Sequence, residues 1–132
     1  MAVKSITLKR KDISRNHAVR EIAIQFDTAN YTTGGFTVDL TSMSNPKKIP
    51  HGKFSGVGSS TLSLPANTDI AAMQSIDGYD FTLQQAAASP TLKNYVIQVW
   101  ASGGAELSAG AMPAALQATD IPFSVMTPLK YE

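Results

Sequence analysis

The feature that most constrains the fold of this chain is a series of short segments in which apolar and polar residues alternate. In residues 19–26, for example, Ile22, Ile24 and Phe26 share one face of an extended chain. A period of two is typical of a strand with one buried face, and the glycines and prolines between the segments favour turns. We therefore predict strands over residues 3–8, 19–26, 36–40, 61–64, 79–83, 95–100 and 121–125, with a glycine-weakened strand or bulge at 54–57.

This series of short strands favours an all-β fold, an antiparallel β-sandwich of jelly-roll-like topology. The chain has 132 residues, which fits a single domain, residues 1–132, that buries a core between two sheets without disulfides. Residues 9–18 are charged and polar, and we predict an exposed loop or arm there, so that residues 1–20 form a first strand and a basic arm. Residues 69–75 favour either one helical turn or an irregular strand.

Two apolar segments near the C-terminus differ in how we expect them to be covered. Residues 95–100 are apolar on both faces, so we predict a strand that is covered on both sides, by its own fold or by a partner. Residues 121–125 contain Pro122, which lacks a backbone donor, and this favours a place at a sheet edge.

The connection between these segments, residues 101–120, is long and rich in alanine and glycine. Its only charges are Glu106 and, at its end, Asp120. A solvated linker normally carries more charge, so we predict that this loop is buried against another subunit. The predicted contacts in it are Leu107, Met112 and Leu116.

The basic charge of the chain is concentrated at its N-terminus. Residues 1–21 carry six basic and two acidic residues, a net charge of +4, whereas the rest carries five basic and eight acidic residues, a net charge of −3. A basic arm on a mildly acidic body fits docking to an acidic surface, and it equally fits a solvated edge strand protected by its charges. The predicted contact residues of the arm are Lys4, Lys9, Arg10, Lys11, Arg15 and Arg20.

The sequence lacks the clustered residues that catalysis or metal binding needs. It contains no cysteine, which excludes disulfides and zinc–thiolate sites. Neither His17 nor His51 has a second ligand at metal-binding spacing, and the hydroxyl residue that a Walker loop needs after Lys53 is replaced by Phe54. We therefore predict no enzymatic activity, no cofactor and no metal site. The residues that folding could still bring together are Asp69, Asp77, Asp80 and His51.

Membrane insertion and direct nucleic-acid binding are not expected. The N-terminus lacks the apolar stretch of a signal peptide, and no segment approaches the length of a membrane span. We therefore expect a protein that is made in a cytoplasm. The basic run at residues 9–11 has no interleaved aromatic residues that could stack on bases.

Three segments, taken in order, carry a further signal. Residues 31–40 form a Gly-Gly turn that leads into an alternating strand ending in Asp-Leu, and residues 95–102 read Y-V-I-Q-V-W-A-S. Residues 104–123 read G-A-E-L-S-A-G-A-M-P-A-A-L-Q-A-T-D-I-P-F. Together these segments, which cover about half of the chain, resemble the head decoration (capsid cement) proteins of tailed bacteriophages.

This resemblance implies a structural virion protein, a jelly-roll-like sandwich on the outer surface of an icosahedral capsid. Such a protein bridges major capsid subunits and stabilises the shell, and it works as a dimer or trimer. Its partners are then the major capsid protein and copies of itself. Two alternatives stay open: another virion component of the neck, tail or fibre, and a small carbohydrate-binding sandwich. The second would need a row of exposed aromatic residues, for which Trp100 and the tyrosines are the candidates.

Overall fold

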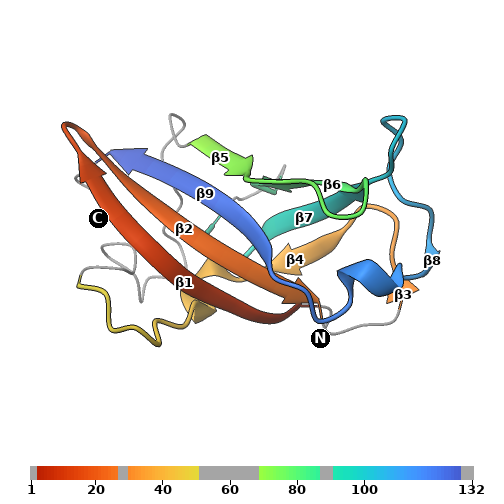
Figure 1. The fold of residues 1–132 in the computed structure, drawn as a ribbon, viewed down its shortest axis with the longest axis horizontal. Coiled ribbons are helices and arrows are strands. Elements are labelled where there is room, and N and C mark those ends of the chain that lie inside the picture. The colour runs from red at the N-terminus through yellow and green to blue at the C-terminus, as the bar shows by residue number, and fades with distance from the viewer. Residues whose placement is uncertain (1–2, 27–29, 51–68, 87–90, 129–132) are drawn as a thin grey trace.

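The computed structural model describes residues 3–26, 30–50, 69–86 and 91–128, and within these ranges the chain is built mainly from β-strands (Figure 1). All pairings between the strands of these ranges are antiparallel. The prediction of an all-β fold with antiparallel sheets is therefore confirmed. The strands predicted at residues 54–57 and 61–64 lie outside the described residues.

The largest sheet has four strands in the order β1-β2-β9-β5. The first two strands form a long hairpin, and the last strand of the chain lies beside it (Figure 1). Of the two alternatives for residues 69–75, the structure has the short strand. The strands of this sheet are β1 (Val3–Ser14), β2 (His17–Phe26), β9 (Ile121–Pro128) and β5 (Asp69–Ala72).

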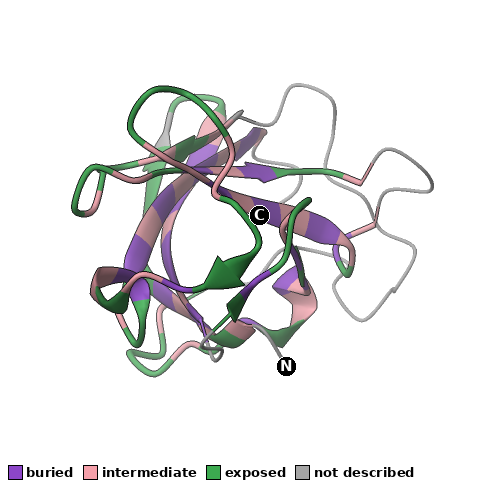
Figure 2. Ribbon diagram, turned by 90° about the vertical axis from the view of Figure 1, so that its right-hand side faces the viewer, coloured by how far each residue is buried: buried purple, intermediate pink, exposed green. Residues whose placement is uncertain are grey.

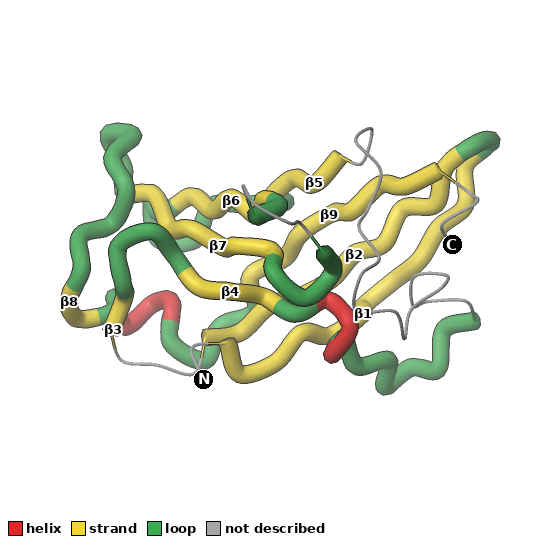
Figure 3. Tube along the Cα trace, turned by 180° about the vertical axis from the view of Figure 1, so that it is seen from behind, coloured by secondary structure: helices red, strands yellow, loops and turns green. Residues whose placement is uncertain are grey.

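A three-stranded sheet in the order β4-β7-β6 lies behind the larger sheet in Figure 1 and in front of it in Figure 3. Its strands are β4 (Phe36–Val38), β7 (Tyr95–Trp100) and β6 (Asp80–Gln84). The remaining pair, at one end of the molecule, is β3 (Asn30–Tyr31) with β8 (Gly110–Ala111). Two short 3₁₀ helices, η1 (Leu40–Ser42) and η2 (Ala114–Leu116), lie in the connections.

The core lies between the two larger sheets. Buried and half-buried residues alternate along β7 and β9 (Figure 2). Ile22 and Phe123 from the larger sheet and Tyr95 and Ile97 from the smaller one belong to the same hydrophobic cluster. At the sides of the molecule β5 approaches β6 and β1 approaches β4. The two sheets therefore converge around one apolar interior.

We predicted a loop or an exposed arm at residues 9–18. In the structure these residues instead form the part of the β1–β2 hairpin next to its turn. The pairing continues from Arg10, opposite Glu21, to Ser14, opposite His17. The prediction of a loop or arm was wrong because charge was taken as a sign of a loop, whereas the alternative of a charged edge strand for the N-terminal region agrees with the position of β1. A charged strand is stable here because β2 is itself held by β9 and offers β1 a full row of backbone partners.

β1 is longer than the strand with which it pairs, with 12 residues against 10 in β2. Its register shifts at Lys4 and again at Lys9, and each shift is a β-bulge. A bulge bends a strand and increases its twist. The hairpin accordingly curves along the core in Figure 1.

β9 lies inside its sheet, between β2 and β5, and not at the edge that Pro122 suggested. Pro122 stands opposite Ala23 of β2, yet its carbonyl oxygen accepts a hydrogen bond from the Met73 N–H (3.0 Å) on the other side. The proline nitrogen faces that same side, beyond the end of β5 at Ala72. The missing donor therefore breaks no bond to β2, and the edge prediction was wrong because proline restricts only one side of a strand.

β7 is the central strand of its sheet, but only one of its faces is buried. Tyr95, Ile97 and Val99 are buried, whereas the residues between them are half-buried. On the half-buried face Trp100 Nε1 donates to Thr82 Oγ1 (3.0 Å). The predicted cover on both faces is therefore only partial within this chain.

Gly35, which directly precedes β4, lies very close to the backbone of β7. Its φ is 88°, and a Cβ there would lie 2.2 Å from the carbonyl oxygen of Ile97. We predict that Gly35→Ala lowers the free energy of unfolding by about 3 kcal/mol or more, because β4 must move away from β7.

Gly34→Ala is the matched control for this variant. Gly34 has a similar φ of 95°, but a Cβ there would meet nothing within 4 Å. Only the backbone strain of about 1–2 kcal/mol is expected. Urea denaturation measures both variants, and equal losses of stability would contradict the close approach.

Candidate interaction surface

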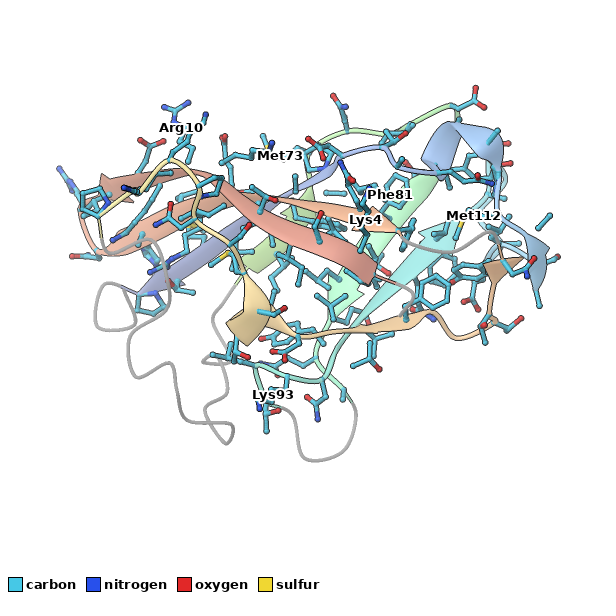
Figure 4. All side chains as sticks on the ribbon, turned by 90° about the horizontal axis from the view of Figure 1, so that it is seen from below. Lys4, Arg10, Met73, Phe81, Lys93 and Met112 are labelled. Carbon is cyan, nitrogen blue, oxygen red and sulfur yellow. The ribbon has the colours of Figure 1, made fainter. Side chains whose placement is uncertain are left out.

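The structure places five of the six predicted basic residues on β1 or in the turn that follows it. Lys4, Lys9 and Arg10 are exposed along the strand, Lys11 is half-buried, and Arg15 is exposed in the turn. β1 is an outermost strand of the four-stranded sheet, so these residues follow one edge of that sheet; Lys4 and Arg10 are labelled in Figure 4. We call these five residues the basic strip.

Two cations of the basic strip have acidic partners. Lys9 Nζ lies 3.3 Å from Asp120 Oδ2, and Asp120 Oδ1 accepts from Gln25 Nε2 (2.7 Å). The hydrogen bond from Gln25, with a smaller contribution from Lys9, holds the pKa of Asp120 below its usual value of 3.8. Arg10 Nε lies 2.7 Å from Asp12 Oδ2, and both side chains stay largely exposed. Exposed ion pairs of this kind are weak, so a partner can compete for these charges.

Arg20 is not part of the basic strip, because its side chain is fully buried, with 0% exposed. It extends from the inward face of β2, between Ala18 and Ile22, and its Nη1 donates to the buried Thr127 Oγ1 (3.1 Å). We assigned Arg20 to the basic arm because of its charge. In β2, however, alternate residues face the core, and position 20 is one of them. Arg20 therefore offers no surface to a partner.

The connection of residues 101–120 folds back onto its own chain. Met112 and Leu116 are 3% and 0% exposed, and Leu107 packs partly buried against the same core. The pairing of β8 with β3 and the turn of η2 hold this connection in place. The apolar side chains that we assigned to a subunit contact are thus covered within the chain, and only Leu107 keeps surface for a partner.

Glu106 ties this connection to two other segments. Its Oε2 accepts hydrogen bonds from the Tyr31 hydroxyl (2.7 Å) and the Gly34 N–H (2.8 Å), and Gln98 Nε2 lies 3.5 Å away. The Tyr31 hydroxyl oxygen in turn accepts from the Val99 N–H (3.2 Å). One carboxylate thus joins the connection, the segment after β3 and strand β7. We call these five residues the Glu106 clasp.

The clasp changes the ionisation of both its acidic groups. Burial, and then the hydrogen bond to Glu106, raises the pKa of Tyr31 to about 12. The hydrogen bonds from Tyr31 and Gly34 lower the pKa of Glu106 below its usual value of 4.5. At neutral pH the phenol is protonated and the carboxylate is ionised, so each satisfies the other. Neither group therefore changes its protonation state near pH 7.

The sequence offered a signal for the clasp that we did not use. Glu106 was noted as a lone charge in a connection rich in alanine and glycine. A lone carboxylate in such a segment is a candidate for charge-assisted hydrogen bonds with donors elsewhere in the chain. Its partners, Tyr31 and Gly34, are 75 and 72 residues earlier in the chain, and only the fold brings them together.

The other polar candidates form no metal-ligating cluster in the described ranges. Asp80 Oδ1 accepts from the Ser75 hydroxyl, and Asp77 lies in the same turn with a φ of 50°. No group of three metal-ligating side chains comes together in the part of the chain that the structure describes, and His51 lies outside it. Among the same residues no helix has the length and apolar character to cross a membrane.

A groove with a volume of about 620 Å³ opens between the beginning of β1 and β4. Val3, Ile6 and Phe36 give it an apolar lining, and Lys4 and Asp39 are its charged residues. The other lining residues are Ser5, Thr32, Gly35, Thr37 and Ser42. The groove thus has an apolar lining, and one of its walls is formed by β4.

The Glu106 clasp predicts a pH-dependent loss of stability in acid. Glu106→Gln keeps the shape of the side chain but removes its charge, so we expect a lower melting temperature at neutral pH. Because the pKa of Glu106 is lowered in the folded chain, its contribution is present above pH 4.5 and is lost as the pH falls through the lower folded value. Thermal unfolding should therefore show a difference between the wild-type protein and the variant that shrinks below pH 4.5. A difference that is unchanged in acid would contradict the clasp.

Tyr31→Phe tests the other half of the clasp and should cost about 1–2 kcal/mol, because the Val99 N–H and the Glu106 carboxylate each lose a partner. The folded pKa of about 12 lies above the usual 10.0. The stability from the phenol is therefore present below pH 10 and is lost as the pH rises toward 12, and the variant lacks this part of the alkaline loss. Combined with Glu106→Gln, the two losses should total less than their sum. Additive losses would mean that the two side chains act separately.

Comparison with known proteins identifies no relative. No family model matches the chain, and neither the curated proteins nor the solved structures gave a match. Its function is therefore inferred from the contacts, charges and exposed backbone described above, together with the resemblance of the three sequence segments.

Proposed function

We propose that this chain is a non-enzymatic structural protein of a bacteriophage virion, which binds the outside of an icosahedral capsid and stabilises it by bridging major capsid subunits. The resemblance of residues 31–40, 95–102 and 104–123 to head decoration proteins supports this proposal. The antiparallel all-β fold is compatible with it. We further propose that the two facing sheets form a β-sandwich of jelly-roll-like type.

The observation that carries the proposal is the basic strip. Five of the six basic residues near the N-terminus lie on β1 or the turn after it, and four of these five are exposed. Positive charge gathered on one border of a chain whose remainder is acidic favours docking to an acidic surface. An outer capsid surface with exposed carboxylates is such a partner, and it would place the protein on the capsid exterior after synthesis in the host cytoplasm.

Self-association is the second part of the proposal, since the resemblance to head decoration proteins implies a dimer or trimer. Within the described ranges, the large apolar side chains that remain well exposed are Ile13 and Met73. They lie near the hairpin tip and after β5, respectively. With Leu107, they are the available apolar contacts between copies or with the capsid.

The other readings have less support. A neck, tail or fibre component would share the fold and the basic strip, and the number of copies per particle distinguishes it from a decoration protein. A carbohydrate-binding module needs exposed aromatic residues, but Tyr31 and Tyr95 lie in the core. We do not propose that module.

Charge reversal on the basic strip tests the capsid proposal. We predict that Arg10→Glu combined with Arg15→Glu weakens binding to capsids assembled without this protein by about tenfold or more, with little change in fold stability. Lys9 is left unchanged, because its partner Asp120 also accepts a hydrogen bond from Gln25 of β2, and a glutamate at position 9 would disturb that contact between segments. Sedimentation of capsids with added protein measures the bound fraction.

Lys93→Glu is the control for non-specific charge effects, because Lys93 is exposed and lies on the opposite side of the molecule from Arg10 (Figure 4). It should be compared with Arg10→Glu alone, since each single variant reverses one charge. Capsid binding that falls equally in both would contradict a specific role of the basic strip. No binding of the wild-type protein to the capsids would overturn the proposed function itself.

A further inference from the structure

The backbone of β7 shows which groups of β4 remain unpaired. The Val99 N–H donates to the Tyr31 hydroxyl (3.2 Å), and the Val99 carbonyl accepts from the Leu107 N–H (2.9 Å). Neither bond goes to β6, which pairs with the other side of β7. Along a strand, the backbone groups of successive residues point to opposite sides. Those of Val99, and of every second residue before it, therefore face β4.

This alternation fixes the direction of the backbone groups of β4. Phe36 is opposite Ile97, and Val38 is opposite Tyr95, so both exchange their hydrogen bonds with β7. Thr37 lies between them, and its N–H and C=O point away from β7 toward the groove, where the residue forms part of the lining. No backbone partner for Thr37 is found within the described ranges. As far as the described residues go, the wall of the groove therefore holds a donor and an acceptor of a strand edge that have no partner.

The position of this edge decides what can reach it. β1 forms the opposite wall, and the segment after η1 closes one end, because Ser44 exchanges hydrogen bonds with Ile6 and Leu8 of β1 (2.9 and 2.8 Å). A second copy of this chain would have to bring a whole sheet into the recess. A single extended segment is thin enough to lie beside β4, and its backbone offers an acceptor and a donor at the spacing of the two Thr37 groups.

The lining of the groove specifies the chemistry of such a segment. Val3, Ile6 and Phe36 offer apolar contacts to the side chains on one face of an added strand. Lys4, near the start of β1, makes no ion pair within the described ranges. Asp39, just after β4, lies toward the closed end and accepts hydrogen bonds from Thr41. The groove thus carries a positive charge at its Lys4 end and a negative charge at its Asp39 end.

The charges at the two ends of the groove specify the end residues of a strand that is added antiparallel to β4. β1 and β4 run the same way in Figure 1, so the beginning of β4 lies at the Lys4 end of the groove. A segment antiparallel to β4 has its N-terminal end beside Asp39 and its C-terminal end beside Lys4. Its complementary charges are therefore a basic residue first and an acidic residue last.

We infer that the groove between β1 and β4 binds an extended segment of a partner protein as an added β-strand, antiparallel to β4. The segment carries apolar residues at alternate positions, a basic residue near its N-terminal end and an acidic residue near its C-terminal end. This inference goes beyond the proposed capsid function and does not rest on it. Its test needs only the purified protein.

The probe is the synthetic peptide Lys-Val-Thr-Val-Thr-Val-Glu with both ends blocked, and the control is the peptide of the same composition with Lys and Glu exchanged. The first peptide should bind more tightly by about tenfold, because the exchanged one places like charges at both ends of the groove. Fluorescence anisotropy measures the affinities. Hydrogen exchange should show that the Thr37 amide becomes protected when the first peptide binds.

Two variants at one position separate backbone pairing from side-chain contact. Thr37→Pro removes the free donor and leaves the bonds of β4 to β7 intact, so it should weaken binding by about tenfold or more. Thr37→Ala keeps the donor and should bind almost as the wild-type protein does. Lys4→Glu should reduce the preference for the first peptide over the exchanged one. Two N-methylated peptides test the same pairing from the side of the partner. One carries its methyl groups on the valine amides and the other on the threonine amides, and at least one of the two peptides should fail to bind.

Four results would overturn the inference. They are no peptide binding by the wild-type protein, equal binding by Thr37→Pro and Thr37→Ala, tighter binding of the exchanged peptide, and a dimer that Thr37→Pro dissociates. The last would assign the edge to a second copy of this chain. Because capsids are absent from all these measurements, a negative result leaves the basic strip and the capsid proposal untouched.

Discussion

The arrangement of the molecule around β3 and the start of β4 depends on the hydrogen bonds that the Glu106 carboxylate accepts. This carboxylate accepts from the Tyr31 hydroxyl, and the Tyr31 ring packs edge to face against Phe36, with ring centroids 5.4 Å apart. Phe36 makes a second edge contact, at 5.5 Å, with Phe26 of β2. Such contacts hold an aromatic ring in a defined orientation. Because Phe36 lines the groove, a hydrogen bond in a distant connection helps to set the shape of the proposed binding surface.

Much of the fold could be predicted from local sequence, but partner choice could not. The alternation around Ile22 and Ile24 identified β2, because a half-buried strand imposes a period of two. The same period does not tell which strands become neighbours, so Pro122 was assigned to an edge although it lies inside the sheet. Charge misled in a similar way for Arg20, whose position in the alternation is a better guide to burial than its side chain. The groove could not be predicted, since it depends on two strands that do not pair.

The two proposed surfaces share one strand. The beginning of β1, with Lys4, forms a wall of the groove, whereas Arg10 and Arg15 lie toward the hairpin tip. An outermost strand invites unwanted pairing, and lysine or arginine side chains are a common protection. Here Ser44 also occupies part of the border of β1. The chain therefore protects most of this border by charge or by its own backbone, and leaves the unpaired groups of Thr37 within a recess.

The bulges of β1 have a consequence for how charge is displayed. In a regular strand, a side chain must belong to one face or the other, and one face of β1 is occupied by Ile6 and Leu8 in the core. A bulge residue has no single partner across the pair, so its side chain is released from this alternation. Lys4 and Lys9 occupy the two bulges, and both are exposed. Strict alternation with Ile6 and Leu8 would turn Lys4 and Arg10 toward the core, so the extra residues that give the hairpin its curvature also let this core-forming strand keep both cations exposed.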